Sequence, residues 1–281
     1  MNYRHHFHAG NFADVFKHVW LTRLLVYLAQ KDAPFHYLDT HAGIGLYDLA
    51  AAPSQRTAEW REGIGRLLTA SLSPACRALI APYLALAGPV RADGSLSAYP
   101  GSPAIAQALL RAQDRMTACE LHPEDCATLR QNLGRDRRAK AIEIDGYVAL
   151  NAYIPPRERR GLVLIDPPFE QADEFARLTQ ALGSAHAKWP GGVYALWYPV
   201  KGLQAGEQMA AMAAAAGITR ILRIELLRTP IGTRGADERL NGCGLLIVNP
   251  PYTFGAQCAV IMPELARILG QNGAGQWRVT E

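Results

Sequence analysis

The tetrapeptide Asp166-Pro167-Pro168-Phe169 is the part of the sequence best suited to chemistry. It follows the apolar run 161–165, which predicts a buried strand. Two successive prolines hold the backbone extended and remove two N–H donors, so the polar groups that remain are acceptors. The Asp166 carboxylate and the Pro167 carbonyl could accept hydrogen bonds from an exocyclic NH2 group while the Phe169 ring stacks on the planar base. The alternative is a purely structural turn.

Three further predicted strands end in residues that could bind a nucleoside. These strands cover residues 35–39, 115–120 and 140–145. The first leads into a turn with Gly43 and Gly45, which leaves room for a ligand against the backbone. Glu120 suits the hydroxyls of a ribose, and Asp145 could receive the amino group of an adenine. Each has a plainer explanation as a tight turn, a solvated glutamate or an Asp-Gly turn, but together they predict one nucleoside pocket.

A second tetrapeptide of the same form, Asn249-Pro250-Pro251-Tyr252, has a different predicted place. The strands before it, 219–227 and 244–248, are joined without a crossover helix, which indicates an antiparallel hairpin. The second strand of such a hairpin runs against the parallel strands and ends at the opposite edge of the sheet. We therefore interpret residues 249–252 as a structural turn.

The alternation of strands and helices predicts an α/β fold with a doubly wound parallel sheet whose last strand is antiparallel. Residues 47–97 lack a convincing strand and predict a small helical insertion after the first strand. The expected division is 1–46 for the tail, first helix and first strand, 47–97 for the insertion, and 98–281 for the remainder. The expected helices cover residues 11–30, 102–113, 123–133, 171–187 and 203–216, the first being amphipathic with Asn11 as its N-cap.

The composition is that of a folded protein. Of the 281 residues, 49% are hydrophobic and 19% charged, and the net charge of +4 excludes a histone-like polycation. The five cysteines are odd in number and form no CxxC pair, which argues against a disulfide framework or a structural zinc site. We find no signal peptide and no apolar run long enough to cross a bilayer. A soluble, cytoplasmic monomer is expected.

Histidine and arginine clusters invite further interpretations. His5, His6, His8 and His18 could suggest a metal site, but no carboxylate or cysteine lies at ligand spacing, so no metal is expected. Two basic clusters are candidate phosphate contacts, with solvated surface as the alternative. They comprise Arg130, Arg135, Arg137, Arg138 and Lys140, and Arg157, Arg159 and Arg160.

The order of these motifs resembles the Rossmann-like, S-adenosylmethionine-dependent methyltransferases with a (D/N)PP(Y/F/W) tetrapeptide, which methylate adenine N6. Across essentially the whole chain it resembles the RlmJ family of 23S ribosomal RNA adenine-N6 methyltransferases. The segments that carry the resemblance are Tyr3-Arg4-His5-His6-Phe7-His8-Ala9-Gly10-Asn11 with Asp14, Lys17 and His18, then Leu38–Gly43, Tyr99–Pro103, Glu120–Pro123, Asp145-Gly146 and Ala195–Pro199.

The resemblance implies roles for individual residues. The residues expected to line the S-adenosylmethionine pocket are His18, His41, Gly43, Ser102, Glu120, Asp145, Gly146 and Asp166. Asp166 would be the catalytic acceptor, helped by Pro167 and Phe169. Tyr3, His6 and Lys17 would contact RNA from an N-terminal tail that becomes ordered over the site. Position 169 is more often Tyr in the family, so a hydrogen bond from that position is in doubt.

Two other functions use similar sequence features. Methylation of DNA adenine or of a protein glutamine amide relies on the same tetrapeptide, although a DNA enzyme would be expected to carry a separate recognition domain. A noncatalytic RNA-binding assembly factor on a degenerate methyltransferase fold is the third possibility. The intact Asp166, Glu120 and Gly43-to-Gly45 turn argue against it.

Overall fold

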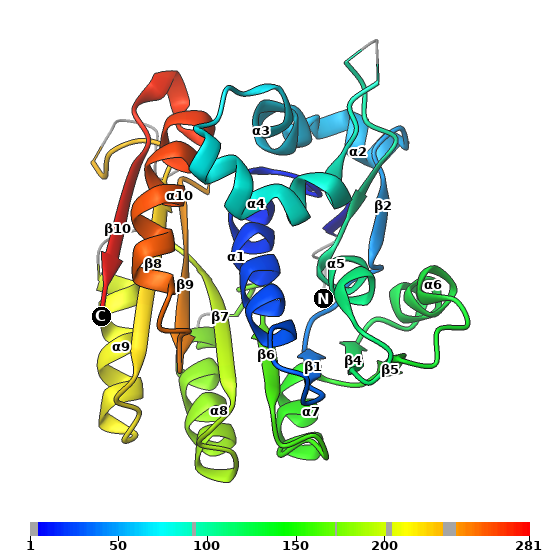
Figure 1. The fold of residues 1–281 in the computed structure, drawn as a ribbon, viewed down its shortest axis with the longest axis vertical. Helices are drawn as coiled ribbons and strands as arrows, with labels where there is room; N and C mark the ends of the chain where they lie inside the picture. The colour runs from blue at the N-terminus through cyan, green and yellow to red at the C-terminus, as the bar shows by residue number, and fades with distance from the viewer. Residues whose placement is uncertain (1–4, 92–93, 172, 201–203, 233–239) are drawn as a thin grey trace.

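The fold is built on one eight-stranded mixed sheet (Figure 1). The computed structural model describes residues 5–91, 94–171, 173–200, 204–232 and 240–281, so the predicted RNA contact Tyr3 lies outside the described residues. The strand order is β10-β8-β9-β7-β6-β1-β4-β5. The strands are β1 (His36–Asp39), β4 (Arg115–Glu120), β5 (Ala139–Glu143), β6 (Gly161–Ile165), β7 (Val193–Pro199), β8 (Ile221–Leu227), β9 (Gly242–Val248) and β10 (Gln276–Thr280).

The central strand β1 lies between β4 and β6 and is parallel to both. Its last residue, Asp39, is in register with Ala118 of β4 and with Leu164 of β6. The carboxyl ends of the three strands therefore meet at one edge of the sheet. The order reverses at β1, and this switch point is where an open α/β sheet binds its ligands.

The predicted antiparallel hairpin is confirmed, because β9 pairs antiparallel with both β7 and β8. Asn249 therefore lies at the opposite edge from the ends of the parallel strands. Its side-chain amide donates hydrogen bonds to the carbonyls of Pro190, at 2.8 Å, and Gly192, at 2.7 Å. These bonds support the interpretation of residues 249–252 as a structural turn. One more antiparallel strand, β10, pairs with β8 and was not predicted.

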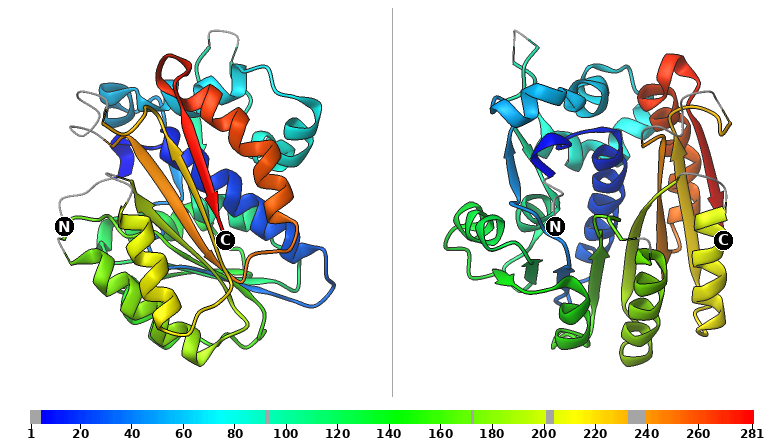
Figure 2. Two further views of the ribbon diagram at one scale, coloured as in Figure 1. Left: turned by 90° about the vertical axis from the view of Figure 1, so that its left-hand side faces the viewer. Right: turned by 180° about the vertical axis from the view of Figure 1, so that it is seen from behind.

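Helices cover both faces of the sheet, as the doubly wound prediction requires (Figure 2). One face carries α1 (Phe12–Ala29), α4 (Pro74–Ala87), α5 (Ser102–Leu109), α6 (Pro123–Leu133) and α10 (Phe254–Leu269). The other face carries α7 (Gly146–Ala152), α8 (Glu174–Lys188) and α9 (Gln204–Ala215). No helix among the described residues has the length and apolar character needed to span a membrane.

Helix α1 is buried on all sides rather than amphipathic, so that prediction was wrong. Its N-terminus was predicted correctly, because the Asn11 side chain accepts hydrogen bonds from the amides of Ala13 and Asp14, both at 3.0 Å. Helix α4 covers the side of α1 that faces away from the sheet. A helix covered on all sides places even its polar residues in the interior, and these must find partners there.

The segment 47–97 begins and ends at a short antiparallel ladder. Its strands β2 (Leu46–Asp48) and β3 (Ala98–Pro100) pair through Tyr47 and Tyr99. The expectation of no strand between the first strand and residue 115 was wrong, because three residues are too few to show a periodic pattern. Besides α4, the segment contains α2 (Ala52–Thr57), the π-helical turn η2 (Arg61–Gly65) and α3 (Arg66–Thr69).

Candidate active site

One cavity of about 1080 Å³ opens at the carboxyl edge of the parallel strands. It collects side chains from the ends of β1, β4, β5 and β6 and from α1 and α5, which are far apart in the sequence. All eight residues expected to bind the cofactor line it, namely His18, His41, Gly43, Ser102, Glu120, Asp145, Gly146 and Asp166. Pro167 and Phe169 line the same cavity. The structure therefore brings together the strand ends that the sequence analysis singled out.

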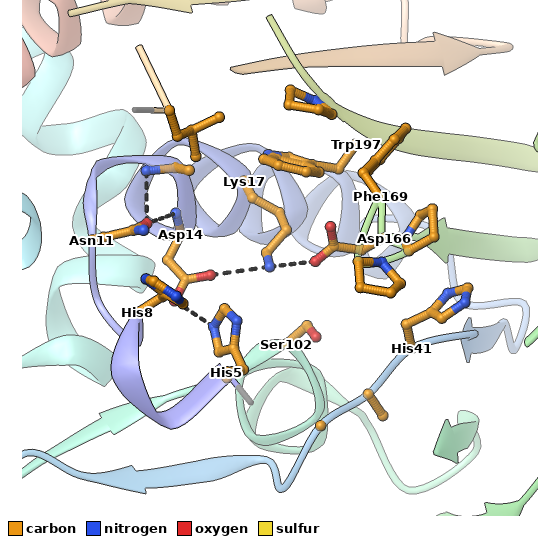
Figure 3. Close-up of a pocket in the computed structure, with 18 of the residues that line it drawn as sticks. His5, His8, Asn11, Asp14, Lys17, His41, Ser102, Asp166, Phe169 and Trp197 are labelled. Atoms are coloured by element: carbon orange, nitrogen blue, oxygen red, sulfur yellow. Dashed lines mark hydrogen bonds and ion pairs between the residues drawn. The ribbon is translucent and has the colours of Figure 1, made fainter. Parts of the chain in front are cut away.

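Asp166 ends a chain of charged groups that reaches back to the N-terminal segment (Figure 3). Its Oδ2 lies 2.5 Å from Nζ of Lys17, which also lies 3.0 Å from Oδ1 of Asp14. Nε2 of His5 lies 2.8 Å from the other Asp14 oxygen. Burial opposes a charged lysine, but the carboxylates of Asp166 and Asp14 outweigh it and raise the pKa of Lys17 well above its ordinary value. Lys17 is therefore a buried cation that holds the Asp166 carboxylate.

The three predicted RNA contacts differ in their positions. Lys17 is only 6% exposed, so it could meet RNA solely through a base that enters the cavity. His6 packs its ring edge-on against Tyr47, with 5.7 Å between ring centroids. Its neighbours His5 and His8 line the cavity instead.

The turn after β1 is held by the carboxylate at the end of β4. Glu120 accepts hydrogen bonds from the amide of Gly43, at 2.9 Å, and from the amide of His122, at 2.8 Å. Gly43 has a φ of +60°, and a Cβ there would lie 2.3 Å from the Tyr47 hydroxyl. Burial raises the pKa of Glu120. The glycine turn and the glutamate thus form one preorganised wall, with oxygen lone pairs left for a ligand.

Beneath the cavity lie two buried polar groups, His18 and Asp39. Burial and the positive charge of Lys17 lower the pKa of His18 well below its ordinary value, so the imidazole is neutral. Burial raises the pKa of Asp39 to about 6. Hydrogen bonds from Ser102 and from the Tyr37 hydroxyl, the latter at 2.8 Å, act in the opposite direction and lower it. Ser102 is the first residue of α5 and lines the cavity. The N-terminus of α5 therefore favours an anionic group of the ligand.

At the end of β5, Asp145 caps helix α7, which the sequence analysis did not predict. Its Oδ1 accepts hydrogen bonds from the amides of Tyr147, at 2.8 Å, and Val148, at 3.1 Å. The Tyr147 ring lies under the guanidinium of Arg177, 4.6 Å from its centroid, and both residues line the cavity. Reading Asp145-Gly146 as a helix start, rather than only as a strand end, would have placed Tyr147 in the site.

An aromatic wall faces the Asp166 carboxylate (Figure 3). The Phe169 ring packs against Trp197, at 5.8 Å between centroids, and against Phe175, at 4.9 Å. Phe169 has a φ of +51°, a backbone conformation that is costly for a bulky residue. In this conformation its ring packs against Trp197 and Phe175. A flat base between this wall and Asp166 would meet an apolar face and hydrogen-bond acceptors.

The first predicted basic cluster runs from the end of α6 into β5, and the second lies just before β6. Arg138 donates to both carboxylate oxygens of Asp136, and Arg160 donates to the carbonyl of Ala33 at 2.9 Å. The guanidinium groups of these two arginines therefore make hydrogen bonds within the protein that stabilise the fold. Within the described residues, no group of three or more His, Cys, Asp or Glu side chains is arranged to hold a metal ion, and all five cysteines are buried and free.

Comparisons with known proteins agree with this geometry. The family model described as "RsmJ: Ribosomal RNA large subunit methyltransferase D, RlmJ" matches residues 32–280. A ribosomal RNA large subunit methyltransferase J of Haemophilus influenzae is 40% identical over 281 residues, covering 99% of this chain and 98% of the relative. The protein of the same name in Escherichia coli is 39% identical, covering 100% and 98%.

A solved structure extends the similarity to the fold. The crystal structure of a Legionella pneumophila protein superposes with a TM-score of 0.85 at 36% identity, covering 97% of this chain and 98% of the other. A family model that matches most of the chain and relatives that match it from end to end assign it without ambiguity. The chain belongs to the RlmJ family of ribosomal RNA large subunit methyltransferases.

Proposed function

We propose that the protein transfers a methyl group from S-adenosylmethionine to the exocyclic N6 amine of an adenine in 23S ribosomal RNA. Family membership supports the reaction and the kind of substrate. The observation that carries the choice of amine is Asp166, which stands at the end of β6 with its carboxylate in the cavity beside the aromatic wall. An enzyme with this substrate would act in the cytoplasm, where bacterial ribosomes are assembled.

The residues of the cavity fit S-adenosylmethionine. Glycine is needed at positions 43 and 146, where a Cβ would lie 2.3 Å and 2.4 Å from neighbouring oxygens, so the backbone there can approach a ligand closely. Glu120 is positioned for the ribose, Asp145 for the adenine, and the N-terminus of α5 with His18 for the carboxylate of the methionine part. When bound, this cofactor supplies a sulfonium methyl group that is already activated for transfer.

The contribution of Asp166 is to make the N6 nitrogen nucleophilic. The lone pair of N6 is delocalised into the adenine ring, which makes this nitrogen a poor nucleophile. Hydrogen bonds from the NH2 group to Asp166 and to the carbonyl of Pro167 draw on its protons and localise that lone pair. Lys17 holds the Asp166 carboxylate in place while positive charge develops on N6. Once N6 carried the methyl group, it would lose one proton, which would leave through Asp166 or solvent.

We propose that the RNA approaches from the side of the N-terminal segment. Tyr3, His6 and Lys17 would act on this side, and the insertion 47–97 would form part of the same rim. The contribution of Thr57, Glu59 and Glu62 to the cavity lining supports this assignment. The target base must be unstacked to reach Asp166, and Phe169 and Trp197 would then stack on it.

The test is methyl transfer from labelled S-adenosylmethionine to deproteinised 23S RNA, 16S RNA and duplex DNA in parallel, with Asp166→Ala as the control. The RNA products are digested to nucleosides. We expect label in N6-methyladenosine from 23S RNA alone and none with the variant. Label in DNA would favour a DNA adenine methyltransferase. No transfer to any of these nucleic acids, with the cofactor still bound, would indicate a ribosomal particle or a protein as substrate.

A further inference from the structure

Three buried side chains form a hydrogen-bonded chain that ends at the cavity. The Tyr83 hydroxyl lies 2.9 Å from the Tyr99 hydroxyl, which lies 2.7 Å from Nδ1 of His18. Both tyrosines are fully buried, and His18 is 1% exposed. The rings of His18 and Tyr99 are stacked, with 5.6 Å between centroids. The chain links α4, β3 and α1, so the segment 47–97 contacts the cavity through it.

Once Nε2–H of His18 has an acceptor in the cavity, water or a bound carboxylate, the protons satisfy this chain in only one direction. Among the residues that the structure describes, Tyr99 is the sole hydrogen-bond partner of the Tyr83 hydroxyl. A buried hydroxyl that donates to nothing is costly, so Tyr83 donates to the oxygen of Tyr99. The Tyr99 proton is then directed to Nδ1 of His18, which must accept it. In the opposite direction, Nδ1 would donate to Tyr99, Tyr99 would donate to Tyr83, and the Tyr83 proton would have no acceptor.

The direction of the chain decides where His18 carries its own proton. The ring is neutral, as argued above, so a lone pair on Nδ1 leaves the single proton on Nε2. Nε2 is buried and has no partner among the described residues, although His18 lines the cavity. An unpaired N–H group on a residue that lines the cavity is suited to an anion.

We propose that Tyr83 and Tyr99 are positioning residues that hold His18 as its Nε2–H tautomer, so that it donates a hydrogen bond to the carboxylate of the methyl donor. The inference rests on the proposed function, which supplies the carboxylate-bearing ligand. Neither tyrosine touches that ligand. They act through His18, as the outer partner of a ligating histidine commonly fixes its tautomer.

Nitrogen-15 NMR of the histidine rings in the free protein tests the direction of the chain, with His18→Gln to assign the signal. We expect the Nε2–H tautomer in the wild type and a shift toward Nδ1–H in Tyr99→Phe. The matched control is Tyr194→Phe, which removes a buried hydroxyl bonded to the carbonyls of Ala185 and Trp189 near the start of β7. An Nδ1–H tautomer in the wild type, or an unchanged tautomer in Tyr99→Phe, would overturn the proposal.

Binding of two adenosyl ligands tests whether His18 contacts the carboxylate of the methyl donor. S-adenosylhomocysteine carries the amino-acid part, whereas 5′-methylthioadenosine lacks it. We expect Tyr99→Phe to raise the Kd of the first about tenfold, the cost of one hydrogen bond to a charged group, and to leave the second nearly unchanged. Tyr83→Phe should follow the same pattern with a smaller effect. Equal losses for both ligands would overturn the role of the carboxylate.

The two proposals fail separately. A wild-type protein that bound neither adenosyl ligand would overturn the proposed function and the carboxylate contact with it. The tautomer of His18 in the free protein would still confirm or overturn the direction of the hydrogen-bonded chain. Thermal unfolding of each variant distinguishes a local change from loss of the fold.

Discussion

Lys17 and Asp166 are 149 positions apart in the sequence and form a buried ion pair, with 2.5 Å between Nζ and Oδ2. The pair joins the first turns of α1 to the end of β6, across the cavity edge of the sheet. The two partners are not equivalent, because Lys17 has a second carboxylate partner in Asp14, at 3.0 Å. Removing the lysine therefore leaves two carboxylates without their shared cation, whereas removing Asp166 leaves Lys17 still paired.

This asymmetry predicts unequal effects on stability. Lys17→Ala should lower the free energy of unfolding by about 3 kcal/mol, as expected when one partner of a buried pair is removed. Asp166→Ala should lower it by less than about 1 kcal/mol, because the Lys17–Asp14 pair remains. The double variant should be more stable than Lys17→Ala alone. Urea unfolding of the three variants checks this, and equal costs for both single variants would contradict it.

The place of Lys17 beside Asp166 also predicts how Lys17 affects activity. We expect Lys17→Ala to reduce methyl transfer to RNA more than it weakens S-adenosylmethionine binding, because Lys17 orients the carboxylate that meets the base. Transfer rates at saturating cofactor, compared with the equilibrium Kd of the cofactor, separate the two effects. Lys31→Ala, at an exposed lysine just after α1, is the matched control. An unchanged rate of transfer would remove Lys17 from substrate positioning.

The strand ends that line the cavity could be predicted from the sequence, whereas the Lys17–Asp166 pair could not. Asp166 and Glu120 each follow an apolar strand, and the carboxyl ends of parallel strands share one edge. The ion pair depends on how α1 lies against the sheet, which no local pattern records. A lysine in a helix is by default solvated, and this one is buried because α1 is enclosed on all sides.

Besides β2 and β3, three further elements were missed, each for its own physical reason. Helix α7 has only seven residues, and its N-cap Asp145 also suits a strand end. Strand β10 is a short, mostly exposed edge strand, and its two alternating apolar residues, Trp277 and Val279, are too few to identify it. Helix α10 contains Pro263, which argues against a helix in sequence, although a proline after the first turn is tolerated here.

Glu120→Gln should weaken cofactor binding with little effect on the chemical step. The carboxylate accepts the amides of Gly43 and His122, and it can still accept bonds from a ribose. A glutamine keeps one acceptor oxygen and presents an NH2 group to one of the two amides. We expect the Kd of S-adenosylmethionine to rise at least tenfold and kcat at saturation to change less than threefold. Glu143→Gln is the control, since Glu143 is exposed and lies in register with Glu120 on β5.

Phe169→Ala should reduce kcat/KM for RNA by about tenfold to a hundredfold, the usual value of one base–aromatic stacking contact. Phe169→Tyr should retain most of the activity, because the stacking face is kept. Both variants are measured with 23S RNA under single-turnover conditions. Activity of Phe169→Ala equal to that of the wild type would show that Trp197 alone supplies the stacking face.

The buried carboxyl of Asp39 predicts a pH dependence of stability. Burial raises its pKa from 3.8 to about 6 in the folded protein. The folded state therefore holds this proton more tightly than the unfolded state, and the stabilisation is fully present below pH 4. It declines as the pH rises from about 4 to about 6 and is lost above that, a change of about 3 kcal/mol.

Asp39→Asn removes this titration, so the stability of the wild type relative to the variant should fall between pH 4 and pH 6 and then stay level. Urea unfolding at half-unit pH intervals measures the difference directly, which cancels the contributions of groups common to both proteins. Asp32→Asn, at an exposed position, should show no such window. A wild type that instead gained stability over the variant in this range would mean that the hydrogen bonds from Tyr37 and Ser102 outweigh burial and keep Asp39 ionised.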